Sequence, residues 1–344
     1  MGHTFSYAVV IGRFQPFHNG HLSLVSHALD IANRVVIVVG SSFAARNVKN
    51  PFTFEERKRM ILDSLLEAGL DDHRVKVVGV QDYHYNENMW VTDLATKVQQ
   101  ATNWSHDVVL VGHRKDASTY YLDLFPYWQY VEHDPARACI WYGGPAQVLN
   151  ATDVRRLLYR GDDRWRSYVP TGTAGFLAEF VNTEEFAELV ADYNYLNEYP
   201  KIWGEGPFIT VDAVVFHKGH VLLVERGERP GKGLFALPGG FLDKSERLLD
   251  GALRELREET GLGISPKTLV DKEVFDAPQR SLRGRVITHA FNFVLDGEEE
   301  KLEQVKGGDD AAKALWMPIY DVLSSRERFY EDHHDIISYF ALRR

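Results

Sequence analysis

The fold of the C-terminal half is decided by residues 238–262, which read PGGFLDKSERLLDGALRELREETGL. Three carboxylates, Glu255, Glu258 and Glu259, stand at i, i+3 and i+4 of a predicted helix that follows a Pro-Gly-Gly turn. Like charges at these spacings weaken an isolated helix by about 0.2–0.5 kcal/mol per pair. A hard divalent cation would reverse that penalty, because it takes carboxylate oxygens as ligands. The spacing therefore predicts a cation site, with a solvated acidic surface as the alternative.

The helix itself is predicted from its ends and its apolar face. Asp243 is expected to cap it, with Glu246 three residues on as the reciprocal capping partner. Gly261 is expected to end it, because glycine tolerates left-handed geometry. Its buried stripe should consist of Leu249, Ala252, Leu253 and Leu256.

Four further residues stand at set positions around the glutamates, namely Gly240, Glu246, Arg254 and Gly261. With the glutamates they resemble the signature box of the Nudix hydrolases, which cleave nucleoside diphosphates linked to another moiety. The resemblance implies an α/β/α sandwich with a mixed sheet. β-rich stretches at residues 210–216, 221–224 and 286–294 fit the strands of that sandwich.

The resemblance also implies the chemistry of the box. Glu255 and Glu259 are the expected metal ligands, Glu258 is a third ligand or a base acting through water, and Gly239 belongs to the same site. Arg254 is expected to orient one carboxylate. Mg²⁺ is the expected cation and Mn²⁺ an acceptable substitute. Such a cation polarises phosphoryl oxygens and activates water.

The catalytic base varies among Nudix families and often lies on a loop outside the box. Here Glu303, Asp309 and Asp310 are the candidates, although a solvated acidic loop is the favoured account of each one taken individually. Residues 275–285 resemble the substrate side of members that act on ADP-ribose. Arginines in this stretch could receive phosphate, with solvent-exposed arginines of a hairpin as the alternative.

A second nucleotide site is predicted near the N-terminus, where residues 12–21 read GRFQPFHNGH between an apolar strand and a helix. The loop follows the carboxyl end of the strand, and ligands bind beyond the carboxyl ends of the strands in an open parallel sheet. The amino terminus of the helix that comes next favours anions. His18 and His21 can donate to phosphate oxygens there. With Gly12, Arg13 and Gly20 they resemble the signature of nucleotidylyltransferases, and the whole string resembles nicotinamide mononucleotide (NMN) adenylyltransferases in particular.

Residues 50–57, NPFTFEER, match the same family. Thr53 and Glu56 are spaced as a capping box, so this stretch is expected to begin a helix. The resemblance places Arg57 at the nucleotide, together with Phe14 of the first loop.

Residues 150–155, NATDVR, resemble the second phosphate motif of the family at a helix start. Asn150 and Ala151 depart from its commonest serine pattern, whereas Thr152 and Arg155 match. The ATP triphosphate is then expected to be surrounded by Arg13, His18, His21 and Arg155.

The middle of the N-terminal half is consistent with a nicotinamide site. Trp90 resembles a tryptophan that stacks on the nicotinamide ring, and Asp82 and Asn86 would bond its carboxamide or the ribose. Helix packing is the alternative for Trp90. Arg114 follows a strand expected at residues 108–111 and would reach phosphate.

Both sets of motifs in one chain resemble the bacterial bifunctional NMN adenylyltransferase/Nudix hydrolase proteins. The resemblance implies that ATP and NMN give NAD and pyrophosphate, and that ADP-ribose is hydrolysed to AMP and ribose 5-phosphate. Two alternatives stay open. The Nudix half can act as a nucleotide sensor, and the first half can adenylylate another phosphate monoester, such as phosphopantetheine.

Length and composition fit this organisation. The chain has 344 residues, and 39 basic against 49 acidic residues give a net charge of −10, which argues against general nucleic-acid binding. No run approaches the roughly 20 apolar residues of a membrane helix. The single cysteine suits a reducing cytosol, and residues 1–6 lack the features of a signal peptide. We therefore expect a cytoplasmic protein, with its oligomeric state left open, a homo-oligomer included.

We expect an α/β protein of two domains. Residues 1–183 should form a Rossmann-like nucleotidylyltransferase domain with a parallel sheet, residues 184–206 a linker, and residues 207–344 a Nudix domain. Within the junction, residues 183–196 are expected to be helical. Residues 197–207 have the proline and glycine content of a connector.

Overall fold

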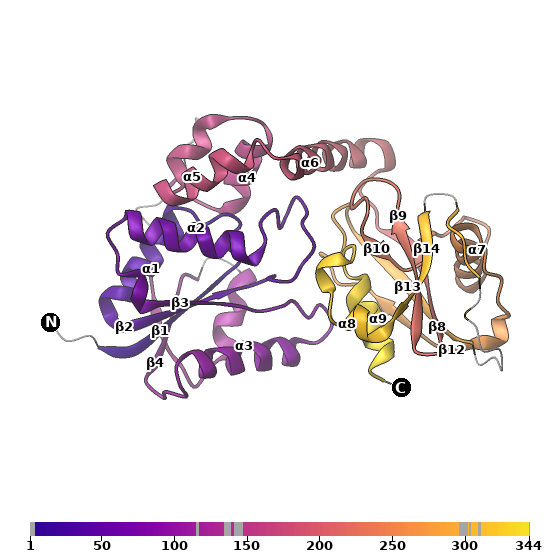
Figure 1. The fold of residues 1–344 in the computed structure, drawn as a ribbon, viewed down its shortest axis with the longest axis horizontal. Coiled ribbons are helices and arrows are strands. Elements are labelled where there is room, and N and C mark those ends of the chain that lie inside the picture. The colour runs from indigo at the N-terminus through magenta and orange to yellow at the C-terminus, as the bar shows by residue number, and fades with distance from the viewer. Residues whose placement is uncertain are drawn as a thin grey trace. The chain divides into compact units, whose positions relative to one another are not determined.

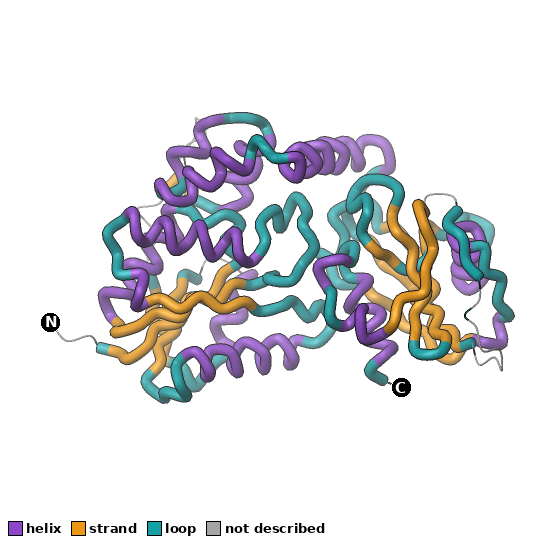
Figure 2. The backbone as a smooth tube through the Cα atoms, in the orientation of Figure 1, coloured by secondary structure: helices purple, strands orange, loops and turns teal. Residues whose placement is uncertain are grey.

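The computed structural model describes residues 4–114, 117–133, 139–140, 147–295, 302, 304–308 and 311–343. The chain divides into two compact units, Met1–Val190 and Ala191–Arg344. The first alternates strands and helices, and the second is richer in strands (Figure 2).

The first unit is built on a five-stranded parallel sheet, which confirms the Rossmann-like prediction (Figure 1). The strands have the spatial order β3-β2-β1-β4-β5. Their bounds are β1 (Phe5–Gly12), β2 (Ala32–Val39), β3 (Val75–Gly79), β4 (Val108–Gly112) and β5 (Gln129–Glu132). Strand β1 has β2 on one side and β4 on the other, so the order of the strands reverses at β1. Ligands bind at such a point, beyond the carboxyl ends of the strands.

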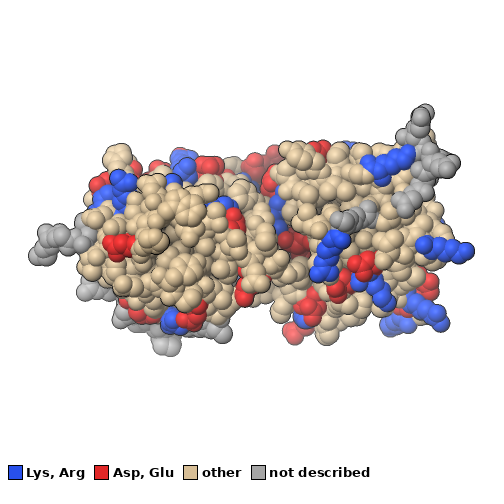
Figure 3. All heavy atoms as spheres, turned by 90° about the horizontal axis from the view of Figure 1, so that it is seen from below, with Lys and Arg blue, Asp and Glu red and all other residues tan. Residues whose placement is uncertain are grey.

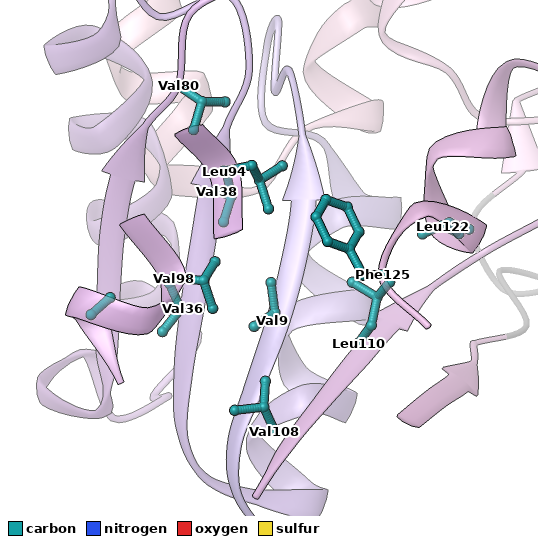
Figure 4. Close-up of a cluster of buried hydrophobic side chains, with 11 residues drawn as sticks. Val9, Val36, Val38, Val80, Leu94, Val98, Val108, Leu110, Leu122 and Phe125 are labelled. Atoms are coloured by element: carbon teal, nitrogen blue, oxygen red, sulfur yellow. The ribbon is translucent and has the colours of Figure 1, made fainter. Parts of the chain in front are cut away.

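Helices cover both faces of this sheet. In Figure 1, α1 and α2 lie on one side and α3 on the other. Val9, Val36, Val38 and Leu110 of the strands pack against Leu94 and Val98 of α3 (Figure 4). The helices are α1 (Asn19–Ile31), α2 (Phe54–Glu67), α3 (Glu87–Ala101), α4 (Ala151–Tyr159) and α5 (Thr171–Phe180). Smaller elements are β6 (Cys139–Ile140), β7 (Gln147–Val148) and the 3₁₀ turns Asp72–Arg74, Ala117–Leu124 and Asp163–Tyr168.

The junction is more helical than its composition predicted. Helix α6 (Glu184–Trp203) continues past residue 196, the predicted end, and contains Pro200. Tyr199 is buried, and its ring meets the ring of Phe208 edge-on with the centroids 6.0 Å apart. This tertiary contact accompanies the continued helix in spite of the proline.

The second unit is a mixed sheet between helices, which confirms the predicted Nudix architecture. The main order is β10-β9-β8-β13-β12; β11 also pairs with β8, and β14 with β9. Strands β8 and β13 run parallel, and the other pairs are antiparallel. The strands are β8 (Phe208–His217), β9 (His220–Arg226), β10 (Phe235–Ala236), β11 (Gly239–Phe241), β12 (Leu269–Phe275), β13 (Val286–Val294) and β14 (Ala311–Pro318).

Helix α7 (Leu248–Thr260) covers one face of this sheet, and α8 (Ile319–Leu323) and α9 (His333–Ala341) lie on the other side (Figure 1). Ala252 and Leu256 of α7 are fully buried against Val211, Ala213 and other strand residues. The predicted Leu249 and Leu253 pack at the edge of that cluster. Short 3₁₀ turns occupy Pro266–Thr268 and Arg326–Arg328.

The predicted start of the helix in the box is wrong. Helix α7 begins at Leu248 with Arg247 as its cap, rather than at Asp243. The Glu246 carboxylate does accept the expected hydrogen bond from the Asp243 amide, but it also accepts the guanidinium of Arg254 from within the helix, and residues 243–246 form a turn that precedes the helix. The predicted end is confirmed, because Gly261 follows the helix with φ of 70°.

Acidic and basic side chains are interspersed on the face of the molecule shown in Figure 3. Among the described residues, no helix combines the length and apolar character needed to cross a membrane.

Candidate active sites

The two histidines of the first motif stack at the start of α1, directly beyond the carboxyl end of β1. Their ring centroids are 3.6 Å apart with 22° between the ring planes. The backbone N–H of His18 donates to Nδ1 of His21 at 3.2 Å. In its neutral form, the His21 ring therefore carries its proton on Nε2, from where it can donate to an anion.

Arg155, at the start of α4, reaches the loop that carries the histidines. Its Nη1 donates to the carbonyl of Gln15 at 2.6 Å, and its Nη2 to Oγ1 of Thr152 at 3.2 Å. Burial, and to a smaller extent the charge of Arg13, lower the pKa of Arg155 to about 10. The guanidinium remains cationic at neutral pH. Motifs about 140 residues apart in the sequence therefore meet at this edge of the sheet.

Lys49 is a residue of this site that the sequence reasoning missed. Burial is the main cause of a lowered pKa of Lys49, and the positive charges of Arg13 and Arg155 also lower it. Lys49 therefore lies near enough to Arg13 and Arg155 for the three positive charges to interact. A signal was present in the sequence, since Lys49 directly precedes the NPFTFEER motif.

Arg57 lies beneath the site rather than on its surface. Its side chain is fully buried and donates to the carbonyls of Thr53, Arg13, Gly40 and Ser41. The predicted capping box of Thr53 and Glu56 is confirmed at the start of α2. Arg57 thus makes backbone contacts where the sequence predicted contact with a nucleotide.

The glycine and phenylalanine positions of the first motif have packing roles. Phe14 is 1% exposed and has a φ of 52°, and its ring lies over Gly12, where a Cβ atom would be 2.9 Å from Cζ of Phe14. The Phe14 ring also meets the ring of His21, with the centroids 4.8 Å apart. Gly20 lies in the first turn of α1. Phe14 therefore supports His21 from inside the domain.

The predicted nicotinamide residues cluster at the start of α3. Asn86 caps that helix by accepting from the amide of Met89 at 3.1 Å, and Asp82 lies half-buried just before it. Trp90 is half-buried and packs against the core of the first unit, edge-on to Tyr121 at 6.1 Å. Part of the Trp90 side chain therefore packs in the core, as the helix-packing alternative predicted.

Arg114 extends from the end of β4, as predicted. Its guanidinium forms two hydrogen bonds with Asp123 and lies 5.0 Å from the centroid of the Tyr130 ring. The hydrogen bonds to Asp123 raise the pKa of Arg114. To meet a phosphate, this side chain would have to exchange Asp123 for the new anion.

In the second unit, Arg254 organises the box. Its guanidinium donates to the carboxylates of Glu246, Glu255 and Glu258, with distances from 2.7 to 3.1 Å. These bonds raise the pKa of Arg254, the pair with Glu246 most strongly. The sequence predicted one such carboxylate, and the structure has three.

Glu259 lies apart from that cluster, against the strand that precedes it. Its Oε2 accepts the backbone N–H of Gly239 at 3.0 Å. Burial, and to a smaller extent the nearby charges of Glu255 and Asp212, raise the pKa of Glu259 to about 8. Burial also raises the pKa of Glu255. The box therefore concentrates negative charge in a partly desolvated place.

The residues of the box fit a hard divalent cation, because oxygen ligands are grouped where a positive charge would offset the cost of burying carboxylates. Within the described parts of the chain, however, no three His, Cys, Asp or Glu side chains already converge as a cation site. Arg254 holds Glu255 and Glu258, and the Gly239 amide holds Glu259. Binding a cation therefore requires local rearrangement of these side chains.

The three predicted bases, Glu303, Asp309 and Asp310, lie outside the described residues. The described residues between them contact the end of α7. The amide of Lys306 donates to the carbonyl of Thr260, and the amide of Gly308 to that of Glu259. This loop therefore runs beside the box.

The arginines of the predicted substrate side differ in their contacts. Arg280 is buried in a two-fold hydrogen-bonded pair with Asp332, with both bonds at 2.8 Å, so it supports the fold. Arg283 lies 5.6 Å from the centroid of the Phe241 ring and 5.9 Å from that of Tyr330. Arg226 lies 4.1 Å from the centroid of the same Tyr330 ring, and its charge lowers the pKa of Glu259. The sequence reasoning missed Arg226, which ends strand β9.

Comparison with known proteins agrees with both halves. Residues 9–131 match the cytidylyltransferase-like family model, and residues 206–340 match the NUDIX domain model. The chain thus joins a nucleotidyltransferase domain to a Nudix domain.

Two curated relatives match one half each. A nicotinamide/nicotinic acid mononucleotide adenylyltransferase from Acinetobacter baylyi is 37% identical over 191 residues, which cover 56% of this chain and 95% of the relative. An ADP-ribose pyrophosphatase from Methanocaldococcus jannaschii is 37% identical over 131 residues, which cover 38% of this chain and 71% of the relative.

A solved structure matches nearly the whole chain. It is a bifunctional NMN adenylyltransferase/ADP-ribose pyrophosphatase from Francisella tularensis, complexed with AMP and a manganese ion. It is 36% identical, has a TM-score of 0.88, and covers 98% of this chain and 99% of its own. The chain belongs to the family of bifunctional NMN adenylyltransferase/ADP-ribose pyrophosphatase proteins.

Proposed function

We propose that the first unit transfers the adenylyl group of ATP to NMN, giving NAD and pyrophosphate, and that the second hydrolyses ADP-ribose to AMP and ribose 5-phosphate. The observation that supports adenylyl transfer most is the stacked pair of His18 and His21 at the start of α1, beside the loop that Arg155 bonds at Gln15. The observation that supports hydrolysis most is the partly buried group of carboxylates around Arg254 and Glu259.

In the first reaction, an oxygen of the NMN 5′-phosphate attacks the α-phosphorus of ATP. A new P–O bond forms as the bond to the β-phosphate breaks, and pyrophosphate leaves with the electron pair. The attacking phosphate is already ionised, so catalysis rests on positioning and on stabilising developing charge. We assign that stabilisation to Arg13, His18, His21, Lys49 and Arg155. Thr152 would add a hydroxyl contact.

His21 is suited to this role by its tautomer. Because Nδ1 accepts the His18 amide, the Nε2 proton is directed elsewhere and can meet a phosphate oxygen. We place the nicotinamide near Trp90, Asp82 and Asn86, and treat Arg114 as a further phosphate contact once it leaves Asp123.

In the second reaction, water attacks a phosphorus of the diphosphate, and the bond to the bridging oxygen breaks to give the two monophosphates. A divalent cation held by Glu255 and Glu259, near Gly239, would supply Lewis-acid polarisation and a more acidic water. We propose Mg²⁺ as the cation, with Mn²⁺ as a substitute. Glu258 is the third ligand or the base, and Arg254 orients the three carboxylates that it contacts.

One product assay on the intact chain tests the proposal. NMN plus ATP should yield NAD and pyrophosphate, and ADP-ribose plus Mg²⁺ should yield AMP. Tight binding of ADP-ribose without AMP release would favour a nucleotide sensor. ATP turnover with another phosphate monoester, such as phosphopantetheine, but not with NMN would change the acceptor. The cytoplasmic location and the absence of nucleic-acid partners stay predictions.

A further inference from the structure

The side chain of Arg57 joins two loops that follow neighbouring strands. Its Nη1 donates to the carbonyl of Arg13 at 2.8 Å, in the loop after β1, and to the carbonyl of Gly40 at 2.7 Å, in the loop after β2. Its Nη2 donates to the carbonyl of Ser41 at 3.1 Å, and its Nε to the carbonyl of Thr53 at 3.1 Å. All three guanidinium nitrogens therefore bond to backbone.

Gln15 makes a second connection between the same parts of the chain. Its Nε2 donates to the carbonyl of Phe52 at 2.9 Å, and its Oε1 accepts the amide of Phe52 at 2.9 Å. Gln15 is 2% exposed, so this amide pair is made in the interior. It ties the loop of residues 12–18 to the segment that leads into α2.

Both joined loops contain a residue in the left-handed region that is not glycine. Phe14 has a φ of 52° and Ser41 a φ of 50°. Such conformations persist only where the surroundings hold them. Arg57 bonds the carbonyl of Ser41 itself and the carbonyl of Arg13, which directly precedes Phe14. Its bonds therefore lie where these loops need support.

We infer that Arg57 and Gln15 are positioning residues that hold residues 12–18 in the geometry needed for adenylyl transfer, without contacting the nucleotide. This inference rests on the proposed function of the first unit. The two side chains act through Arg13, whose carbonyl Arg57 holds, and through the histidines at the end of the loop. The full burial of Arg57 fits this role better than contact with a ligand.

A positioning role predicts a particular split between kinetic constants. Displacement of Arg13 and the histidines by about 1 Å weakens interactions that matter most in the transition state and costs roughly 10²-fold. A residue that binds ATP uniformly would instead raise the KM for ATP and leave kcat unchanged. Arg57→Lys keeps the positive charge but cannot reach several carbonyls with a planar fork.

The experiment measures NAD formation and ADP-ribose hydrolysis by the intact Arg57→Lys chain. We expect kcat for NAD formation to fall roughly 10- to 100-fold, with KM values for ATP and NMN within about threefold of wild type. Hydrolysis should be unchanged, and thermal unfolding should show that the first unit is folded. Arg59→Lys is the matched control. Arg59 lies on the same helix, is half exposed and pairs with Glu179, so both activities should stay within about twofold.

Gln15→Met provides a second variant that leaves Arg57 intact. It should also lower kcat for NAD formation. In the double variant with Arg57→Lys, kcat should fall by less than the product of the two single fold-losses, because both side chains hold one loop.

The wild-type chain is assayed first, since failure to make NAD refutes the proposed function. If wild type makes NAD, two results overturn the inference. One is an Arg57→Lys chain with unchanged kcat and KM. The other is a KM for ATP raised tenfold or more at unchanged kcat, which would make Arg57 a nucleotide ligand.

Discussion

Replacing Gly240 with alanine tests the geometry of the hydrolase site through one added methyl group. A Cβ at Gly240 would lie 2.5 Å from Oε1 of Glu255 and 2.7 Å from its carboxyl carbon, where ordinary contacts begin at 3.4 Å. The Glu255 carboxylate must therefore move by about 0.9 Å. Because the obstructing atoms end a flexible side chain, the fold should lose little stability. A displacement of about 1 Å at a catalytic group costs roughly 10²-fold in rate.

The assay follows AMP release from ADP-ribose, and the binding of Mn²⁺ by calorimetry. We expect kcat for hydrolysis to fall about 100-fold with weaker Mn²⁺ binding, and NAD synthesis to be unchanged. Gly263→Ala is the matched control, because a Cβ there would meet only Nε of Arg257, at 3.8 Å. Wild-type hydrolysis and Mn²⁺ affinity in the Gly240→Ala chain would refute the assigned role of Glu255.

Three other predictions follow from buried charges. Arg280→Met should destabilise the second unit by about 3–5 kcal/mol in urea unfolding, because it leaves the Asp332 carboxylate buried without its guanidinium. Lys49→Met should weaken ATP binding roughly 10- to 100-fold in titrations, through loss of a charge-assisted phosphate contact, with hydrolysis unchanged. Because the pKa of Glu259 is raised to about 8, a cation must displace a proton at neutral pH. Mn²⁺ affinity should therefore rise about tenfold per pH unit from pH 6 and level off above pH 8. Unchanged unfolding of Arg280→Met would contradict the stabilising role of its pair with Asp332. Unchanged ATP affinity of Lys49→Met would contradict the phosphate contact, and pH-independent Mn²⁺ binding would contradict the role of Glu259 as a ligand.

Local sequence signals were enough to predict several of the elements that carry the motifs. Alternating and apolar stretches predicted β1, β4, β8 and β13, and β13 has the predicted bounds. Capping and glycine chemistry predicted the start of α2 and the end of α7. The predicted start of α7 is wrong. Glu246 bonds Arg254 in the turn before the helix, and spacing alone does not reveal this contact. The predicted end of α6 is wrong, and the longer helix places Tyr199 against Phe208, a contact that the proline and glycine content does not reveal.

The motifs predicted which parts of each site come together, but they did not predict burial. Arg57 belongs to a motif and yet is enclosed among backbone carbonyls. Lys49 and Arg226 stand just outside the stretches that were singled out, and only the fold brings their charges to the two sites. Whether a charged residue faces a ligand or the interior depends on long-range packing, which the local pattern does not encode.

Adenylyl transfer and hydrolysis belong to two separate sites in this proposal, and a pair of variants in the intact chain tests that separation. NAD formation and AMP release are measured for Glu259→Gln and His18→Ala, with folding checked by thermal unfolding. We expect Glu259→Gln to abolish AMP release and keep NAD formation, and His18→Ala to do the reverse. Loss of both activities in either folded variant would contradict it.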